Sequence, residues 1–591
     1  MERRRVVEEL IPAVDEAATN GEVEPSESGL YLHWKGRNQA RVAVPKPRVL
    51  EEAPEHSDHT PVDPGNLVIE GDNRQAMVSL MGQWRGKVDV ALLDVPYNTG
   101  DGDLRYSDKR FHDPDADDDD AVYVTNTDGG RHTKWLNQMA PTFRLVRDLM
   151  APHGVLFVHI NDIELPRLLM LLEDSFDEKN RIGTLVWKSA TDNNPSRIIT
   201  EHEYIVCWAK QIDSVPTPWV GPFGETRQWM LDQYAAIRAE TDDPGVIQRR
   251  WKAFIGDRDS KKRITSGLLN YKYADATAPY RGGDLQFPGG DGPHHYELRH
   301  PVTHVVCKEP NGGYRHPWET MQTLLADDRI LFGRDEKTIP QYKRYLDEAE
   351  GEPLRSVINA FGGKAVNADI RRLFPEQPDI FRRPKPVGLE EMLLSFVANR
   401  DAVVLDSFAG SGTTGHAVMR LNKQDAGTRR FILVEEGKEG DPYAATLTAE
   451  RLRRARRDED LPGGFTFLRV TRQIDAAGFA TFQRHEVIAA IRQADASGRG
   501  TGIRPVAGEW VIGTNHRDEA ICLHYPGPNG GMTTAEHLRA MFDEAYRLGL
   551  STPLRVYGDA CEVFEDDSFV FLQIPDELLR NLSIPGRRRE R

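Results

Sequence analysis

The chain has 591 residues, 39% of them hydrophobic, and at roughly 150 residues per domain this length predicts about four structural units. The formal net charge of -16 argues against a protein that coats nucleic acid non-specifically, whereas a DNA enzyme with local basic patches stays compatible with it. No stretch approaches the roughly 18 uninterrupted apolar residues of a membrane span, and the N-terminus lacks the apolar core of a secretory signal.

Cysteine and histidine usage gives no sign of a metal. The histidines between 294 and 304 lack a cysteine partner, so we predict base-contacting or surface histidines there and no metal site. Scattered cysteines without a Cys-x-x-Cys pair fit a reduced chain, and we expect a cytoplasmic protein without membrane contact. The cysteines are Cys207, Cys307, Cys522 and Cys561.

The first part of the chain changes character at residue 66. Residues 1–65 are rich in Pro, Glu and Asp and are interpreted as an N-terminal arm or subdomain with one short strand at 29–36. From residue 66, apolar strands alternate with amphipathic helices, which predicts an α/β fold with a mostly parallel sheet covered on both faces. Strands are expected at 66–73, 87–94, 154–160, 181–188 and 201–210, and helices at 74–84, 133–151 and 164–176.

The alternation is then interrupted and resumes. Residues 211–380 are dense in Gly, Pro, aromatic and charged residues and are interpreted as an inserted domain. The α/β pattern returns with helices at 388–398 and 416–424 and strands at 402–406 and 429–435, and a final α/β piece spans 461–591. The expected units are therefore 1–65, 66–210, 211–380, 381–460 and 461–591.

Charged runs interrupt this pattern. An acidic run at 113–120 is interpreted as a solvated loop. The basic runs are interpreted as solvated helix faces and a tail; they lie at 248–252, 260–263, 451–457 and 586–591.

A glycine-rich signature follows the strand at 402–406. Gly410-Ser-Gly412-Thr-Thr-Gly415 stands between that strand and a helix, and the next strand ends in Glu435 about 20 residues further on, where a carboxylate can take ribose hydroxyls. The glycines let the backbone turn sharply and approach a ligand. The pattern predicts a cofactor site, either for a nicotinamide or flavin dinucleotide or for a nucleoside cofactor without phosphates.

A second signature is the stretch "VALLDVPYNTG", in which a buried strand runs into Asp94, Val95, Pro96 and Tyr97. An exocyclic amine on a base is a poor nucleophile, because its lone pair is delocalised into the ring. The Asp94 carboxylate and the Val95 carbonyl can accept its two N–H bonds, which frees the lone pair to attack a sulfonium methyl. Pro96 stiffens the turn, and Tyr97 offers a stacking face for a flipped-out base.

The two signatures are expected to meet. In an open α/β sheet, ligands bind at the carboxyl ends of the strands, and both loops lie at such ends. Hydride transfer does not account for the Asp94 loop, whereas methyl transfer to an amino group accounts for both loops. We therefore predict an amino-group methyltransferase and keep a nicotinamide-dependent enzyme as a distant alternative.

At this point the sequence resembles the amino-methylating DNA methyltransferases in which the catalytic motif precedes the cofactor motif, and most of all the modification subunits of type III restriction–modification systems. The resemblance covers about 66–460. It is carried by "NLVIEGDN", "DVPYNTG", "HTKWLNQM", "LFVHINDIEL", "TLVWK", "NNPSRIITEHEYIVCWAK", "RPKPVGLE", "FAGSGTTG" and "RRFILVEE", and more weakly by "YGDACEV" and "FVFLQIPDEL".

The resemblance implies a Rossmann-like catalytic domain that uses S-adenosylmethionine, a target-recognition domain in the insertion and a small C-terminal α/β domain. It implies double-stranded DNA as substrate, a homodimer formed through the C-terminal domain and a helicase-nuclease restriction subunit as partner. The matching catalytic residues are Asp94, Val95, Pro96 and Tyr97. The matching cofactor-binding residues are Asp72, Lys385, Asp406, Phe408, Ala409, Gly410, Gly412 and Glu435.

Further predictions concern the residues that contact DNA and the base that is methylated. Arg281, Arg299 and Arg315 in the insertion are candidates for reading guanine edges or contacting phosphates. Adenine N6 is the expected target, with cytosine N4 as the alternative, because one loop geometry serves either amine. Val95 stands where the family usually has a proline, so a catalytically weak DNA-recognition subunit of a defence complex is the rival function.

Overall fold

The computed structural model leaves the acidic run at 113–120 and the basic run at 586–591 outside the residues that it describes. The expected strand at 29–36 also lies mostly outside them, and its described end, 33–36, is a turn that precedes helix α2 (Arg37–Val42). The described residues are 33–42, 45–60, 65–99, 110–111, 122–123, 130–189, 197–221, 224–264, 267–289, 291–349, 351–363, 366–381, 384–436, 442–479, 481–494, 503–506, 508–515, 517–528 and 530–582.

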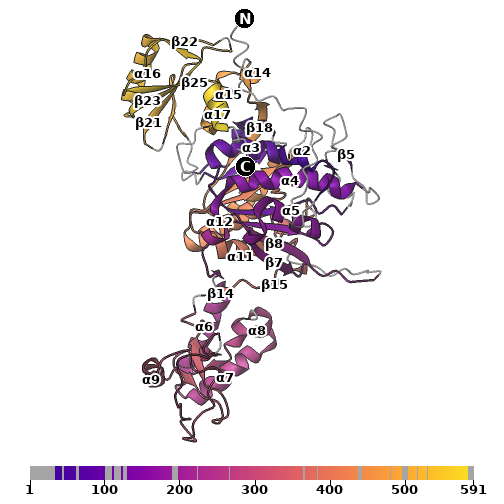
Figure 1. The fold of residues 1–591 in the computed structure, drawn as a ribbon, viewed down its shortest axis with the longest axis vertical. Coiled ribbons are helices and arrows are strands. Elements are labelled where there is room, and N and C mark those ends of the chain that lie inside the picture. The colour runs from indigo at the N-terminus through magenta and orange to yellow at the C-terminus, as the bar shows by residue number, and fades with distance from the viewer. Residues whose placement is uncertain are drawn as a thin grey trace.

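The largest sheet within these residues is a ten-stranded one that occupies the middle of the molecule (Figure 1). Its central strands are parallel, whereas β1 at one edge and β8 near the other run antiparallel to their neighbours. In spatial order the strands are β1 (Arg48–Glu52), β18 (Thr466–Gln473), β2 (Leu67–Glu70), β17 (Arg430–Glu435), β16 (Val403–Asp406), β3 (Val88–Asp94), β6 (Met150–Ile160), β8 (Glu203–Ala209), β7 (Arg181–Trp187) and β15 (Val357–Ile358).

Helices cover both faces of this sheet, because its strands alternate their side chains between two apolar cores. Leu405 faces one core, together with helices α3 (Asn73–Trp84), α4 (Arg131–Leu149) and α5 (Leu165–Phe176). Val404 faces the other core, with helices α11 (Val387–Val397), α12 (Thr413–Asp425) and α13 (Glu450–Glu459). The expected α/β class with a mostly parallel, doubly covered sheet is confirmed.

The insertion leaves the sheet after β8 and forms a separate body with its own core around Trp251 and Met230 (Figure 1). Its entry and exit are paired, since β9 (Val220–Gly221) runs antiparallel to β14 (Glu352–Pro353). The body contains helices α6 (Gly224–Glu240), α7 (Pro244–Gly256), α8 (Arg258–Arg263) and α9 (Trp318–Ala326), and a sheet of strands β10 (Tyr273–Ala274), β11 (Pro279–Gly283), β13 (Gln341–Tyr345) and β12 (Ile330–Leu331).

The chain returns to the main sheet earlier than the expected boundary at 380. Strand β15 pairs in parallel with β7, and Ile358 and Leu373 pack into the core beneath α11. Helix α10 (Ala368–Leu373) therefore belongs to the catalytic domain. Strand β15 has only two residues and helix α10 only six, too few to give a clear hydrophobic period, which is why the sequence pattern placed the boundary too late.

The main sheet also reaches beyond 66–460 at its edge, where β1 and β18 pair with each other. A C-terminal domain follows, with a sheet of strands β19 (Arg504–Pro505), β20 (Val511–Thr514), β21 (Glu519–Leu523), β23 (Ser551–Gly558) and β25 (Phe569–Gln573). Its helices are α15 (Arg484–Ala494), α16 (Ala535–Arg547) and α17 (Asp576–Leu582). Among the helices that the structure describes, none combines the length and apolarity needed to cross a membrane.

Candidate functional site

The two sequence signatures lie side by side at one edge of the main sheet. Strand β3, which ends at Asp94, pairs in parallel with β16, which ends at Asp406, and β16 pairs in turn with β17, which ends at Glu435. Carboxyl ends of parallel strands meet at the same edge. The long insertion therefore separates the two loops in sequence but not in space.

The loop after Asp94 is fixed by buried polar contacts. Trp135 Nε1 donates to the Pro96 carbonyl at 2.7 Å, and Val95 is 2% exposed within an apolar core. Asn98 adopts a left-handed conformation with φ of 57°, and its amide donates to Glu164, a fully buried carboxylate. The backbone therefore turns sharply after Tyr97 and is held in place by α4 and the residue before α5.

Four polar side chains converge beyond this loop. Lys385 Nζ lies 2.9 Å from Asp94 Oδ1 and 3.4 Å from Glu203 Oε2, and it stands 4.9 Å from the centre of the Tyr97 ring. The Tyr97 hydroxyl donates to Glu203 Oε2 at 2.8 Å. Lys385 comes from the segment before α11 and Glu203 from the first position of β8, so three separate parts of the chain build this cluster.

The charge states in this cluster follow from burial and proximity. Burial lowers the pKa of Lys385, but the carboxylates of Asp94 and Glu203 outweigh it and hold the pKa above its ordinary value. Burial raises the pKa of Glu203, but Lys385 and the Tyr97 hydroxyl leave it below its usual range. Burial, followed by the two neighbouring carboxylates, raises the pKa of Tyr97 well above its usual range. At neutral pH Lys385 is therefore a cation, Glu203 a carboxylate and Tyr97 a neutral phenol.

A second polar pair supports the site from within the sheet. His159, which pairs with Asp94 in the sheet register, lies 3.1 Å from Glu390 of α11, and both side chains are buried. Burial lowers the pKa of His159, but the Glu390 carboxylate outweighs it and the pKa lies above its ordinary value. This pair links the catalytic strand to the helix that directly follows Lys385.

The glycine-rich loop after β16 has the backbone that its sequence predicts. Gly410 and Gly412 have φ of 51° and 82°, in the left-handed region that favours glycine. The amide of Phe408 donates to Asp406 Oδ1 at 3.0 Å, and the amide of Ala409 donates to the Val434 carbonyl at 3.1 Å. A Cβ on Gly410 would contact Phe381 Cζ at 3.4 Å, an ordinary van der Waals distance, so the ring of Phe381 lies against this turn of the loop.

Glu435 closes the loop from the neighbouring strand. Gly410 N donates to its Oε2 at 2.5 Å and Glu436 N to its Oε1 at 3.0 Å, and its side chain is buried. Burial raises the pKa of Glu435 to about 8, and burial likewise raises the pKa of Asp406 to about 7. A carboxyl group that is desolvated in this way is suited to accept hydrogen bonds from a ligand's hydroxyls.

Asp72 stands at the end of the next strand and caps helix α3. Its Oδ1 accepts from the amides of Arg74 and Gln75 at 3.0 and 2.9 Å. The following residue, Asn73, donates to the Ser407 carbonyl of the glycine-rich loop at 3.2 Å. Asp72 thus lies beside the glycine-rich loop, at the N-terminus of α3.

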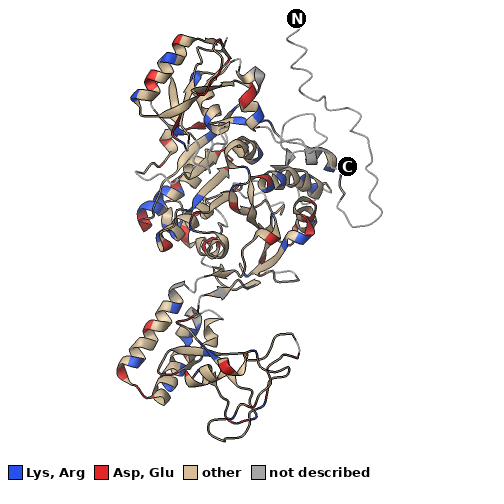
Figure 2. Ribbon diagram, turned by 60° about the vertical axis from the view of Figure 1, so that its left-hand side comes forward, with Lys and Arg blue, Asp and Glu red and all other residues tan. Residues whose placement is uncertain are grey.

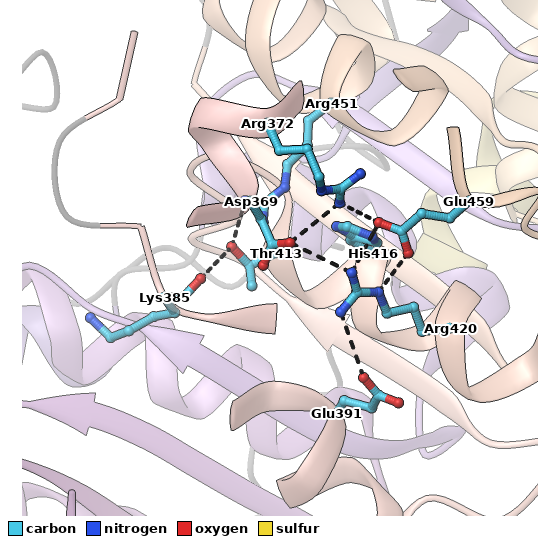
Figure 3. A network of polar contacts seen from close by, with 9 residues as sticks. All are labelled: Asp369, Arg372, Lys385, Glu391, Thr413, His416, Arg420, Arg451 and Glu459. Carbon is cyan, nitrogen blue, oxygen red and sulfur yellow. Dashed lines mark hydrogen bonds and ion pairs between the residues drawn. The ribbon is translucent and has the colours of Figure 1, made fainter. Parts of the chain in front are cut away.

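The basic run at 451–457 is only in part a solvated helix face, since Arg457 is exposed but Arg451 is not. Arg451 is fully buried behind the glycine-rich loop, where it donates to the Ser411 and Thr413 hydroxyls, and burial lowers its pKa to about 10 (Figure 3). Farther along α13, Glu459 receives Arg420 at 2.7 Å and His416 at 3.0 Å. Arg451 therefore anchors the back of the cofactor loop, an arrangement that the sequence of the run alone does not distinguish from a surface patch.

The three candidate DNA-contacting arginines are all in the inserted body, but only two of them are exposed. Arg281 is half-buried in β11, with its guanidinium 5.5 Å from the centre of the Tyr271 ring. Arg299 is 63% exposed beside Glu297, and Arg315 is exposed, with its backbone amide donating to the Leu285 carbonyl. Figure 2 shows basic and acidic residues mixed over the inserted body.

Comparison with known proteins identifies the family of this chain. The family described as DNA methylase matches residues 88–440. The Mod subunit of the type III restriction-modification enzyme EcoP15I from Escherichia coli is 32% identical over 461 residues, which cover 73% of this chain and 70% of that protein. The StyLTI Mod subunit from Salmonella typhimurium is 27% identical, over 69% of this chain and 58% of that protein.

Among solved structures, this chain is similar to a putative DNA modification methylase from Thermus thermophilus complexed with S-adenosyl-L-methionine. The identity is 16% and the TM-score 0.31, over 69% of this chain and 99% of the other. The family match covers more than half of the chain, and the EcoP15I relative exceeds 30% identity over most of both sequences. The chain therefore belongs to the N6/N4 DNA methylase family.

Proposed function

We propose that this protein methylates adenine N6 in double-stranded DNA at specific sites, with S-adenosylmethionine as methyl donor. The observation that carries the proposal is the placement of Asp94, Val95 and Tyr97 at the end of β3, directly beside the glycine-rich loop at the end of β16. An amine acceptor site and a nucleoside site thus share one edge of the sheet.

Asp94 and the Val95 carbonyl act as acceptors for the two N–H bonds of the target amine. The neighbouring Pro96 carbonyl already receives the Trp135 indole, which leaves the Val95 carbonyl for the substrate. Holding both N–H bonds out of the ring plane restores the lone pair of the nitrogen. Stacking on Tyr97 is worth roughly 1–3 kcal/mol and offsets part of the few kcal/mol that flipping the base costs.

The nucleoside part of the cofactor fits the glycine-rich loop. Glu435 would accept the ribose hydroxyls, Gly410 and Gly412 would let the backbone come close, and Phe408 and Asp72 would hold the adenine part. When bound, S-adenosylmethionine supplies a sulfonium methyl group. Acidic side chains stand at the ends of β3, β16 and β17, and a sulfonium cation bound beside them would favour their ionised forms.

Recognition of DNA is assigned to the inserted body, 222–351, through exposed residues such as Arg299 and Arg315. The half-buried Arg281 is assigned a structural role against Tyr271. Because the relatives at 32% and 27% identity are Mod subunits of type III restriction-modification enzymes, we assign the chain to a restriction–modification system with a separate restriction subunit. Dimerisation through the C-terminal domain is part of the same proposal.

Valine at position 95 is compatible with activity, because the proposed acceptor there is a main-chain carbonyl. The side chain of Val95 is buried and Pro96 is tied to Trp135, so the loop is held by contacts that do not need a second proline. The rival function, a catalytically weak recognition subunit, predicts that turnover on bare DNA is low and rises when Val95→Pro is introduced.

The test is methyl transfer from labelled S-adenosylmethionine to unmethylated genomic DNA, followed by nucleoside analysis of the product. N6-methyladenine is expected, and sequencing of the marked sites then gives the recognition sequence. N4-methylcytosine would keep the mechanism and replace the base. A protein that binds the cofactor but transfers no methyl group, also with Val95→Pro, would refute the proposal.

A further inference from the structure

Lys385 stands where the proposed chemistry needs the target amine. Its Nζ lies 2.9 Å from Asp94 Oδ1, within hydrogen-bond distance of the acceptor, and also 4.9 Å from the centre of the Tyr97 ring. A base stacked on Tyr97 and bound through its amino group to Asp94 would have to place its nitrogen in the same region. One ammonium group thus meets both requirements for the substrate nitrogen.

A second carboxylate lies within reach of the same ammonium. Glu203 Oε2 is 3.4 Å from Lys385 Nζ, close enough for an ion pair but longer than a good hydrogen bond. Glu203 is also held by the Tyr97 hydroxyl at 2.8 Å, which fixes its position beside the ring. The Lys385 side chain is only 10% exposed. If its ammonium leaves one carboxylate, it must therefore pair with another.

We propose that Lys385 occupies the target-amine position in the free enzyme. When the base enters, the ammonium of Lys385 moves to Glu203, which serves as a second ion-pair partner. Glu203 is then a positioning residue: it keeps Lys385 paired while Asp94 becomes free for the base, and it holds the Tyr97 ring in its stacking orientation. This inference rests on the proposed function, because it assumes that Asp94 receives an amine.

The charges in the cluster are consistent with such an exchange. Lys385 is cationic, Glu203 is ionised and Tyr97 is neutral, so moving the ammonium from Asp94 to Glu203 changes the position of one charge without leaving it unpaired. The displaced contact is between an ammonium and Asp94, and it is replaced by one between Asp94 and a base amine that gains positive charge during methylation. In an enzyme without Glu203, entry of the base would leave the buried ammonium of Lys385 without an ion-pair partner.

The first experiment is a double-mutant cycle on methyl transfer, with the DNA site mapped from genomic methylation. Glu203→Gln keeps an acceptor for the Tyr97 hydroxyl but removes the charge, and kcat is expected to fall on the order of 10- to 100-fold, the effect of losing a charged partner. KM for S-adenosylmethionine is expected to stay unchanged. Glu203→Gln combined with Lys385→Met is expected to recover most of the lost kcat, because no ammonium then competes for Asp94.

A matched control is Glu201→Gln, two residues away, where the carboxylate pairs with Lys188 at 3.5 Å outside the cluster. This variant is expected to leave kcat unchanged. A purely structural role of Glu203 predicts that the losses of Glu203→Gln and Lys385→Met add up. Additive losses, or a wild-type kcat in Glu203→Gln, would overturn the proposal.

The second experiment needs no methyl transfer and therefore separates this inference from the proposed function. Lysines of the cofactor-free and DNA-free protein are trace-labelled with acetic anhydride, and the acetylation of Lys385 is read by mass spectrometry. Asp94→Asn and Glu203→Gln are each expected to leave Lys385 protected, whereas the double variant is expected to raise its labelling by roughly tenfold or more. Full acetylation of Lys385 in Asp94→Asn alone, or protection of Lys385 from acetylation in the double variant, would show that Glu203 is not a second ion-pair partner.

Discussion

The pH dependence of nucleoside binding depends on one carboxyl group, that of Glu435. Burial raises its pKa to about 8, so below that pH the group is mostly protonated in the free protein. Hydroxyls of a bound ribose donate to the carboxylate and favour its ionised form. Binding therefore releases a proton, and affinity is expected to rise as the pH increases towards 8 and to level off above it.

The size of the effect follows from the pKa. At pH 6 a group with a pKa of about 8 is ionised in only about 1% of molecules, so the dissociation constant should be roughly 100-fold higher than on the plateau. Between pH 6 and 7 the slope should be about tenfold per pH unit. Glu435→Gln removes the titration and should give a flat profile at the weaker affinity.

The assay is isothermal titration with 5′-methylthioadenosine from pH 6 to 9, because this ligand has the ribose but no titrating amino-acid part. Asp406→Asn is the control, since burial raises the pKa of Asp406 to about 7 and its titration must be told apart from that of Glu435. Repeating the titration at pH 6 in buffers of different ionisation enthalpy should show about one proton released. A wild-type affinity that does not change with pH would refute the assignment of the titration to Glu435. So would a pH dependence that is lost in Asp406→Asn but kept in Glu435→Gln.

Other substitutions test the remaining parts of the site. Asp94→Ala should lower methyl transfer by on the order of 10²–10³-fold, in a radiolabel assay, while cofactor binding by titration is unchanged. Trp135→Phe removes one donor to the catalytic loop, worth about 1 kcal/mol, and should lower kcat roughly fivefold with no change in KM for the cofactor. Gly410→Val places a β-branched residue at φ of 51° and should weaken cofactor binding by roughly tenfold or more. Arg315→Ala should lower the salt dependence of DNA affinity by about one unit of slope, measured by fluorescence anisotropy, whereas Arg281→Ala should leave that slope unchanged.

Much of the catalytic domain could be predicted from sequence, because its elements are marked locally. Strand β3 is a run of apolar residues that ends in Asp94, and β16 ends where the glycines begin. Glycines at positions that need positive φ, such as Gly412, identify the cofactor loop without any knowledge of its neighbours. Parallel strands then bring both loops to one edge, as expected.

Other features could not be predicted, because their meaning depends on distant partners. Glu203 opens an ordinary buried strand, and nothing in "EHEYIVCWAK" shows that it receives the Tyr97 hydroxyl and faces Lys385. Arg451 belongs to a run that has the composition of a surface patch, yet it is buried behind Ser411. The only available signal for Glu203 was a charged residue at the first position of a strand whose other residues are apolar.

The sequence by itself determined most strands and helices of 66–210 and 381–460 and the two loops, because periodic hydrophobicity and glycine conformations are local properties of the chain. The family was indicated by the resemblance of its motifs. Only the tertiary structure decided that Lys385 lies on Asp94, that the insertion ends before β15 and that Arg281 is half-buried while Arg315 is exposed. Electrostatic contacts and burial depend on which segments meet after folding, and Asp94 and Lys385 belong to distant parts of the chain.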